Sequence, residues 1–473
     1  MSGKPKLINA PTASACAALL ASLVAIASPS YAETVFDGSK ARLNLSGKLR
    51  YLTQEVVSAG CRMTAQIDTA NAQEELRVSV DKFETILNGL EKGSLTLGIP
   101  SEEKNRRPLR AITNLREKWA PVRTASDNIL AGNGTPADLA AMAGANADLL
   151  EATIVLATEI SGQYSNPQEL LQSDAMSIGI AGRQSMFAHQ IAASVCGLSA
   201  QVANLGNKAE LAETIEVFQR SLIALRDGLP DAGINPPPNE AILKELTQVI
   251  DYWEGHQAKL LGLTASDGVS AENVAEAADV ADELTDDMLN VVTLYMLSTP
   301  GQEDVYRVPL AAYAENELKQ WLTNKELVDA IKAQNLEHAN LTQEQVDALD
   351  LQWRAERKNG GGELITKLLE RPSSEWLRQQ SDATAGFVTE VFVMDNKGLN
   401  VAQSVETSDY WQGDEAKWQE TYGNGSGNMH ISEIEFDEST GFYQSQASLP
   451  IFDPETGSMI GAITFGINVQ SLL

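Results

Sequence analysis

The chain has little of the chemistry from which most active sites are built. Its 473 residues include three cysteines, four histidines and 6% aromatic residues. No HExxH, CxxCH or GxSxG motif and no glycine-rich phosphate loop after a strand is present. We therefore expect no metal site, no cofactor and no enzymatic activity. The histidines stand far apart in the sequence and are expected to be ordinary core or surface residues; they are His189, His256, His338 and His430.

Positive charge is also scarce. The chain has 35 lysines and arginines against 64 aspartates and glutamates, which gives a formal net charge of −29 at pH 7. Such a chain is repelled by the phosphates of nucleic acids and by anionic membrane surfaces. We therefore expect no nucleic-acid partner.

Long apolar runs are confined to the N-terminus. Lys4 and Lys6 precede a run of small and apolar residues at 15–27, and Ser30 and Ala32 provide small residues at the −3 and −1 positions. This pattern predicts a signal peptide over residues 1–32, cleaved after Ala32, and hence a periplasmic location. An uncleaved anchor is the alternative, although the run is shorter than the roughly 20 residues of a spanning helix. We expect no membrane span elsewhere.

Two segments of the chain repeat one another. When the sequence is shifted by 135 residues, 43–93 aligns with 178–228 without a gap. Because apolar, glycine and cysteine positions all agree, the match indicates a duplication rather than a shared composition. Matched pairs include Cys61 with Cys196, Gly93 with Gly228 and, after one deletion, Trp119 with Trp253.

Each repeat has the pattern of amphipathic helices. An apolar stripe at spacings of four and three runs from Leu76 to Leu90, and its counterpart runs from Leu211 to Leu225. Each stripe must be buried against other helices, which predicts a mainly α fold with an antiparallel helical bundle. The expected helices end at Gly93 and Gly228, then span 105–131 and 239–262, and finally 136–163 and 270–298.

The two cysteines of the mature chain occupy equivalent positions of the repeats. An exported protein with Cys61 and Cys196 as its remaining cysteines favours a disulfide. If the repeats pack about a pseudo-twofold axis, residues near that axis face their own counterparts. We therefore predict a Cys61–Cys196 disulfide.

The last third of the chain has a different character. Helices are expected over 308–338, 342–357 and 363–382, and the periodicity changes to two from Gly386. These signals predict a C-terminal α+β domain with an antiparallel sheet of about five strands. Its strands are expected at 387–394, 399–404, 429–436, 441–451 and 459–469. The predicted domains are 33–165, 166–300 and 301–473.

The start of each repeat resembles a known family. Residues 43–54 read LNLSGKLRYLTQ and residues 178–189 read IGIAGRQSMFAH. Both resemble the INxAGRQRMLSQR opening of the PilJ-type domain, the N-terminal sensory domain of type IV pilus methyl-accepting chemotaxis transducers, which is related to nitrate/nitrite sensor kinases. The resemblance covers roughly residues 40–300 in two copies.

That resemblance implies an anion-binding arginine. In the nitrate sensors an arginine of this motif binds the anion between helices, and Arg50 occupies its position in the first copy. The second copy has Ser185 there and keeps the earlier arginine, Arg183. A guanidinium suits an oxyanion because it donates two parallel hydrogen bonds. Arg50 and Arg183 are therefore candidate ligand-binding residues, and the alternative is that both are ordinary helix residues.

The C-terminal region resembles a second family of sensors. A long helix, a hairpin with an Asp-x-x-Gly turn at 395–398, the aromatic segment SDYWQGDEAKW at 408–418 and further strands follow in order. This layout is similar to Cache domains, which are PDC-type and PAS-like. In that family a small ligand lies between the sheet and the layer after the first hairpin. The residues that fall there are Tyr410, Trp411, Asp414 and Trp418.

Two functions remain open at this point. Two sensor-like modules lead us to expect a periplasmic protein that binds a small molecule and relays its presence to a membrane-bound chemoreceptor or histidine kinase. The alternative is an envelope adaptor whose modules serve protein contacts, in which case Trp411 and Trp418 would simply cap the sheet. The ligand class and the formation of a homodimer are left open.

Overall fold

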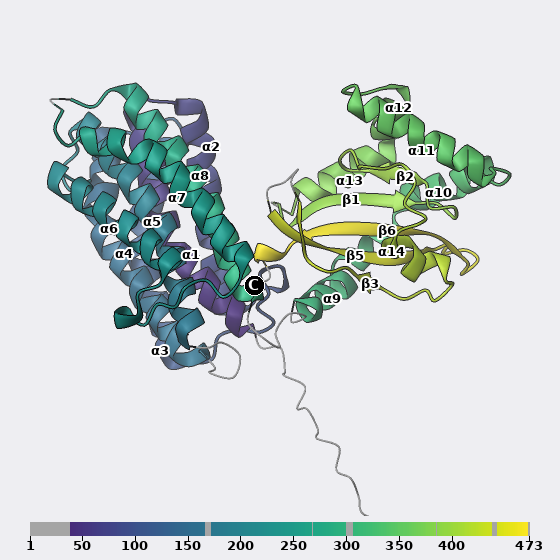
Figure 1. Ribbon diagram of the computed structural model, residues 1–473, viewed down its shortest axis with the longest axis horizontal. Coiled ribbons are helices and arrows are strands. Elements are labelled where there is room, and N and C mark those ends of the chain that lie inside the picture. Colours follow the sequence, from purple (N-terminus) through teal and green to yellow (C-terminus); the bar gives the residue numbers. More distant parts are fainter. Residues whose placement is uncertain are drawn as a thin grey trace, which may run out of the picture. The chain divides into compact units, whose positions relative to one another are not determined.

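The computed structural model describes residues 38–165, 172–266, 268–298, 306–384, 386–437 and 442–471. The described residues form a bundle of long helices and a C-terminal α+β region (Figure 1). The predicted signal peptide and its cleavage site at Ala32 lie outside these residues.

The bundle contains four long helices from each repeat. Those of the first repeat are α1 (Ser39–Thr64), α2 (Thr69–Lys92), α3 (Arg106–Leu130) and α4 (Pro136–Tyr164). Those of the second are α5 (Gln172–Ala200), α6 (Lys208–Asp227), α7 (Glu240–Gly262) and α8 (Ala271–Leu297). Capping boxes at Thr135 and Ser270 begin α4 and α8, and Gly93 and Gly228 end α2 and α6 with φ of 82° and 79°.

The first helix of each repeat is broken where the sequence predicts continuity. Gln66 and Asp68 adopt left-handed backbone conformations between α1 and α2, with φ of 59° and 44°. Gln201, the counterpart of Gln66, does the same at φ 55°. These residue types are not strong breakers, so their sequence gives little sign of a turn. Each repeat therefore has four helices instead of the expected three.

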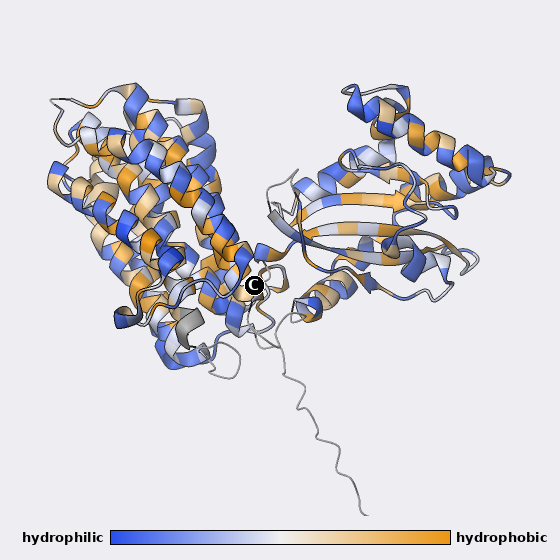
Figure 2. Ribbon diagram, viewed as in Figure 1, coloured by the Kyte–Doolittle hydropathy of each residue, from blue (hydrophilic) through white to orange (hydrophobic). Residues whose placement is uncertain are grey.

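An aromatic pair lies in the core of each repeat. Phe83 stacks on Trp119 with ring centroids 4.0 Å apart, and Phe218 meets Trp253 edge-on at 4.5 Å. All four side chains are buried. Figure 2 shows apolar and polar residues alternating along the bundle helices, as expected when one face of each helix is buried.

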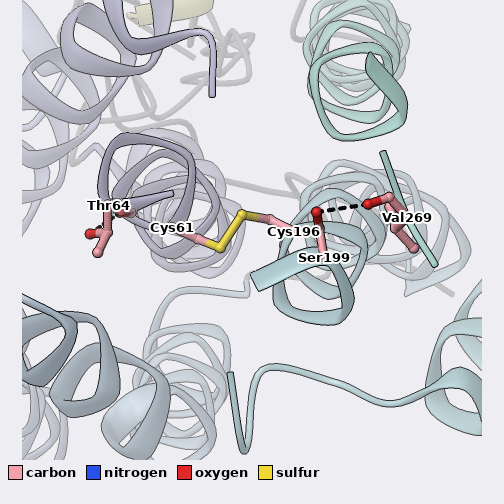
Figure 3. The surroundings of a disulfide bond; sticks show 6 residues. Cys61, Thr64, Cys196, Ser199 and Val269 are labelled. Carbon is pink, nitrogen blue, oxygen red and sulfur yellow. Dashed lines mark hydrogen bonds between the residues drawn. A yellow bond between two sulfur atoms is a disulfide. The ribbon is translucent and has the colours of Figure 1, made fainter. Parts of the chain in front are cut away.

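A disulfide joins the two repeats, as the duplication predicts. Cys61 of α1 and Cys196 of α5 are bonded, with their Cα atoms 6.2 Å apart (Figure 3). Both cysteines are buried. One turn after Cys196, the Ser199 hydroxyl donates to the Val269 carbonyl at 2.9 Å, which links the end of α5 to the segment before α8. The ends of α1 and α5 are thus tied together.

Helix α4 differs from the expectation that no further segment could span a membrane. It is long and apolar enough to do so by length and composition alone. The apolar residues of α4 also pack inside the bundle, where Leu149, Leu156 and Ile160 are buried in the core of the first repeat. Core helices of bundles commonly have such a composition.

The C-terminal region is a helix-covered antiparallel sheet. Its helices are α9 (Arg307–Asn316), α10 (Lys325–Glu337), α11 (Gln343–Lys358), α12 (Glu363–Leu369), α13 (Pro372–Asp382) and the short α14 (Ala416–Trp418). Its strands are β1 (Val388–Met394), β2 (Asn400–Gln403), β3 (His430–Ile431), β4 (Glu435–Asp437), β5 (Phe442–Phe452) and β6 (Met459–Asn468). The order is β2-β1-β6-β5-β3, and β4 also pairs with β5. The predicted strand at 429–436 is therefore two short strands.

The two faces of the sheet are covered differently. Val391 and Val393 of β1 belong to the core cluster that includes Leu377 of α13. The alternate residues Phe392 and Met394 lie with Ala462 of β6 in a separate cluster, against which Trp418 and Tyr422 pack. The sheet thus has helices on one face and the segment after the first hairpin on the other. Figure 2 shows the apolar character of β1 and β6 that this double burial requires.

Candidate functional site

The two candidate arginines line one cavity in the bundle. This cavity has a volume of about 610 Å³ and is bordered by α1, α4 and α5. Arg50 reaches it from the first repeat and Arg183 from the second. The remaining lining is mostly apolar, with two hydroxyl groups; it consists of Ile154, Thr158, Ser161, Met176, Gly179, Met186 and Phe187. The structure therefore brings together the two arginines that the motif suggests.

The charges of this cavity are unbalanced. Within the described ranges, neither Arg50 nor Arg183 forms an ion pair with a carboxylate. Arg50 is partly buried and its Nε atom has no hydrogen-bond partner, whereas Nε of the exposed Arg183 donates to the Gly179 carbonyl at 3.3 Å. Burial lowers the pKa of Arg50 to about 10, and repulsion from Arg183 adds to the decrease. A bound anion would offset both effects.

A second cavity lies in the C-terminal domain. It has a volume of about 300 Å³, and both Trp411 and Trp418 line it together with Lys397. The indole of Trp411 donates to the Lys397 carbonyl at 2.8 Å, and that of Trp418 donates to the Asp395 carbonyl at 3.1 Å. The indole groups therefore hold the segment 411–418 against the first hairpin, and both rings also pack against apolar side chains.

The other two candidates of this domain lie elsewhere. Tyr410 lines a separate cavity of about 100 Å³ with His338 and Arg371, and its ring stacks on Trp353. Asp414 is exposed and lines neither cavity. The four candidates thus do not converge, and the charged group at the tryptophans is a lysine rather than the expected carboxylate. Lys397 was missed, although the turn at 395–398 places it beside the aromatic segment.

A third group of polar residues is found where the sequence gives no motif. Glu55 of α1, His189 of α5 and Asp282 of α8 each place one nitrogen or oxygen atom so that all three atoms lie within 4.8 Å of one another. No metal site was expected from the sequence. The three residues lie on three different helices, so they form no motif with a fixed spacing. No local spacing could have revealed the group.

The helical bundle that holds the arginine-lined cavity is similar in sequence to a family of sensory domains. The family model described as type IV pili methyl-accepting chemotaxis transducer N-term (PilJ) matches residues 34–144 and 169–284. Two tandem segments of the chain are thus similar to this family, in agreement with the sequence resemblance. This similarity supports a sensory role in signal transduction.

Other comparisons add little. No curated protein matches the chain significantly. Among solved structures, the sensor domain of the V. cholerae histidine kinase DctB is 15% identical over 36% of this chain, with a TM-score of 0.22. The chain spans about half of that structure, 55% of its length. At this score the similarity does not define the fold of any part of the chain.

Proposed function

We propose that this protein is a periplasmic sensor that binds a small oxyanion between α1 and α5. The observation that carries the proposal is that Arg50 and Arg183 line one cavity without a carboxylate partner among the described residues. Two guanidinium groups of like charge are favoured beside each other when an anion lies between them. The arginines come from different repeats, so the anion would contact both.

Other features support the proposed location and partner. A disulfide persists in oxidising compartments such as the periplasm, and the predicted signal peptide agrees with that location. A sensor of this kind needs a membrane-bound chemoreceptor or histidine kinase to carry its signal inward. The anion would shift the population between two arrangements of α1 and α5, which the partner then distinguishes.

The C-terminal domain is proposed to be a Cache-like module. Its helix-covered sheet, first hairpin and aromatic segment fit that layout, and the cavity beside Lys397 favours an anionic solute. An adaptor role is the second candidate. It is favoured by the use of both indole groups, at Trp411 and Trp418, in holding the segment against the hairpin.

The first experiment is a thermal-shift and calorimetric screen with nitrate, nitrite, phosphate and small carboxylates. An anion at one hundred times its dissociation constant should stabilise the protein by about 2.7 kcal/mol. We expect Arg50→Ala to weaken binding at least about tenfold, because it removes a charge-assisted hydrogen bond. Arg183→Ala should weaken binding less, because that side chain is more exposed.

Two controls locate the ligand. Arg220→Ala removes an exposed arginine of α6 that pairs with Glu216, and it should leave binding unchanged. Lys397→Ala tests the cavity of the C-terminal domain. Loss of binding in Lys397→Ala alone would move the site out of the bundle, and the absence of any stabilising anion would favour the adaptor role.

A further inference from the structure

Three helices bring one imidazole and two carboxylates together inside the bundle. The ligand atoms of Glu55, His189 and Asp282 lie within 4.8 Å of one another. Metal–nitrogen and metal–oxygen bonds of about 2.0–2.2 Å place neighbouring ligand atoms roughly 3–4 Å apart. Small rotations of the side chains would therefore bring the three atoms to bonding distance from a common centre.

His189 is buried beside the two carboxylates but is hydrogen-bonded to neither of them. Its side chain is 2% exposed, and no described residue forms a hydrogen bond with either ring nitrogen. The imidazole stacks instead on Tyr51, with centroids 6.0 Å apart. A buried polar group without a hydrogen bond costs free energy, so the site favours a ligand that the ring can bind.

The carboxylates have cations nearby, Lys82 for Glu55 and Arg62 for Asp282, but these are not at ion-pairing distance. Neither Glu55 nor Asp282 forms an ion pair within the described part of the chain, and both are partly buried. Burial raises the pKa of Glu55 to about 7; Lys82 and a hydrogen bond with Ser79 oppose this increase, whereas Asp282 and Asp286 add to it. Burial likewise raises the pKa of Asp282.

The remaining charged groups leave the surroundings acidic. Burial, with Arg62 and Lys82, lowers the pKa of His189 to about 3, so its ring is in the neutral form that binds metals. Lys82 is exposed, and Arg62 is engaged by Glu75 and Asp68. Asp279 and Asp286 are exposed on α8 beside Asp282 and add negative charge.

We propose that Glu55, His189 and Asp282 form a binding site for one divalent transition-metal ion, for which Zn²⁺ is the natural probe. Three protein ligands with one nitrogen and two oxygens suit Zn²⁺ and leave a position for water. The imidazole disfavours Mg²⁺ and Ca²⁺, which prefer oxygen ligands. The ion would connect α1 of the first repeat with α5 and α8 of the second.

The duplication predicts one site per chain. The counterpart of His189 in the first repeat is Gln54, whose amide nitrogen donates to Asn146 at 2.9 Å and whose oxygen accepts from it at 3.2 Å. The side-chain amide of Gln54 therefore has both its donor and its acceptor paired with Asn146. In the second repeat the imidazole meets carboxylates instead.

The disulfide fixes two of the ligands relative to each other. Cys61 lies six residues after Glu55, and Cys196 lies seven residues after His189. At 1.5 Å per residue these offsets are about 9 and 10 Å along α1 and α5. The bond between the cysteines thus keeps Glu55 and His189 at similar positions along the axes of α1 and α5.

The test measures metal binding by the purified oxidised protein after treatment with a chelator. Equilibrium dialysis with elemental analysis should give one Zn²⁺ per chain, with little competition from Mg²⁺ or Ca²⁺. His189→Ala, Glu55→Gln and Asp282→Asn should each weaken binding at least about tenfold. Co²⁺ should give a visible absorption band that is lost in His189→Ala, which reports direct bonding by the imidazole.

Matched controls separate a bonded ion from attraction by negative charge. Asp286→Asn removes a charge one turn from Asp282, and His256→Ala removes a histidine whose Nδ1 contacts the Tyr252 carbonyl. Both should retain binding within about threefold. Glu55→Gln should fold without metal, because it removes an unpaired charge. Absence of stoichiometric Zn²⁺, or binding that persists in His189→Ala, would overturn the proposal, and neither result bears on the arginine-lined cavity.

Discussion

Glu55 is a partly buried carboxylate that the bundle holds without a cation at ion-pairing distance. Burial raises its pKa from 4.5 to about 7; Lys82 and Ser79 oppose this increase, and Asp282 and Asp286 add to it. The folded protein therefore binds a proton more tightly there than the unfolded chain does. The favourable contribution is fully present below about pH 4.5 and is lost as the pH rises through 7. Stability should therefore decrease over this range.

Glu55→Gln should remove this part of the pH dependence. In the presence of a chelator we expect the variant to be more stable than the natural chain by about 1–3 kcal/mol at pH 8, with the difference largely gone at pH 5. Urea unfolding at the two pH values measures both quantities. An equal difference at pH 5 and pH 8 would show that ionisation of Glu55 is not the cause.

Residues of the candidate sites differ in how far the sequence reveals them. The cysteine pair and the two arginines could be predicted, because the duplication and the motif give each a defined position. Asp414 illustrates the opposite case, since its exposure depends on how the segment after the hairpin turns. Glu55, His189 and Asp282 could not be predicted, because only the packing of three helices brings them together.

The elements of the bundle follow local rules closely. The predicted helix over 105–131 corresponds to α3 (Arg106–Leu130), and that over 136–163 corresponds to α4, because polar caps and turn residues bound them. The break before α2 was missed, since it rests on left-handed Gln66 and Asp68 rather than on glycine or proline. Strand positions were also predictable, but the central place of β6 between β1 and β5 was not, because pairing is set by distant contacts.

The apolar stripe of α6 provides a test of the helix packing. Phe218 is fully buried against Trp253, and Phe218→Ala should cost about 3–5 kcal/mol through lost burial and the cavity left behind. Val217 is the adjacent residue and is 37% exposed, so Val217→Ala should change stability by less than about 1 kcal/mol. Chemical denaturation followed by tryptophan fluorescence compares the two variants. Similar losses in both would contradict the assigned face of α6.

The whole molecule combines two copies of one domain that have acquired different polar interiors. Arg50 of the first copy corresponds to Ser185 of the second, and Gln54 corresponds to His189. Each proposed site therefore draws different residues from the two copies across the packed pair α1 and α5. A duplicated chain can specialise in this way, whereas two identical subunits would place the same residue on both sides.

The disulfide between the copies should matter most to the molecule as a whole. It closes a loop across a sequence separation of 135 residues, and the chain-entropy model gives a stabilisation of about 4–5 kcal/mol for a loop of that size. Reduction should lower the urea midpoint of unfolding accordingly. The Cys61→Ser/Cys196→Ser variant should have the same midpoint as the reduced protein, and adding reductant should not change it. Intact mass after alkylation without reductant checks the starting state, where two free thiols would contradict the bond. Helices α1 and α5 carry ligands of both proposed sites. The Cys61→Ser/Cys196→Ser variant should therefore also bind the anion and Zn²⁺ more weakly than the oxidised protein does.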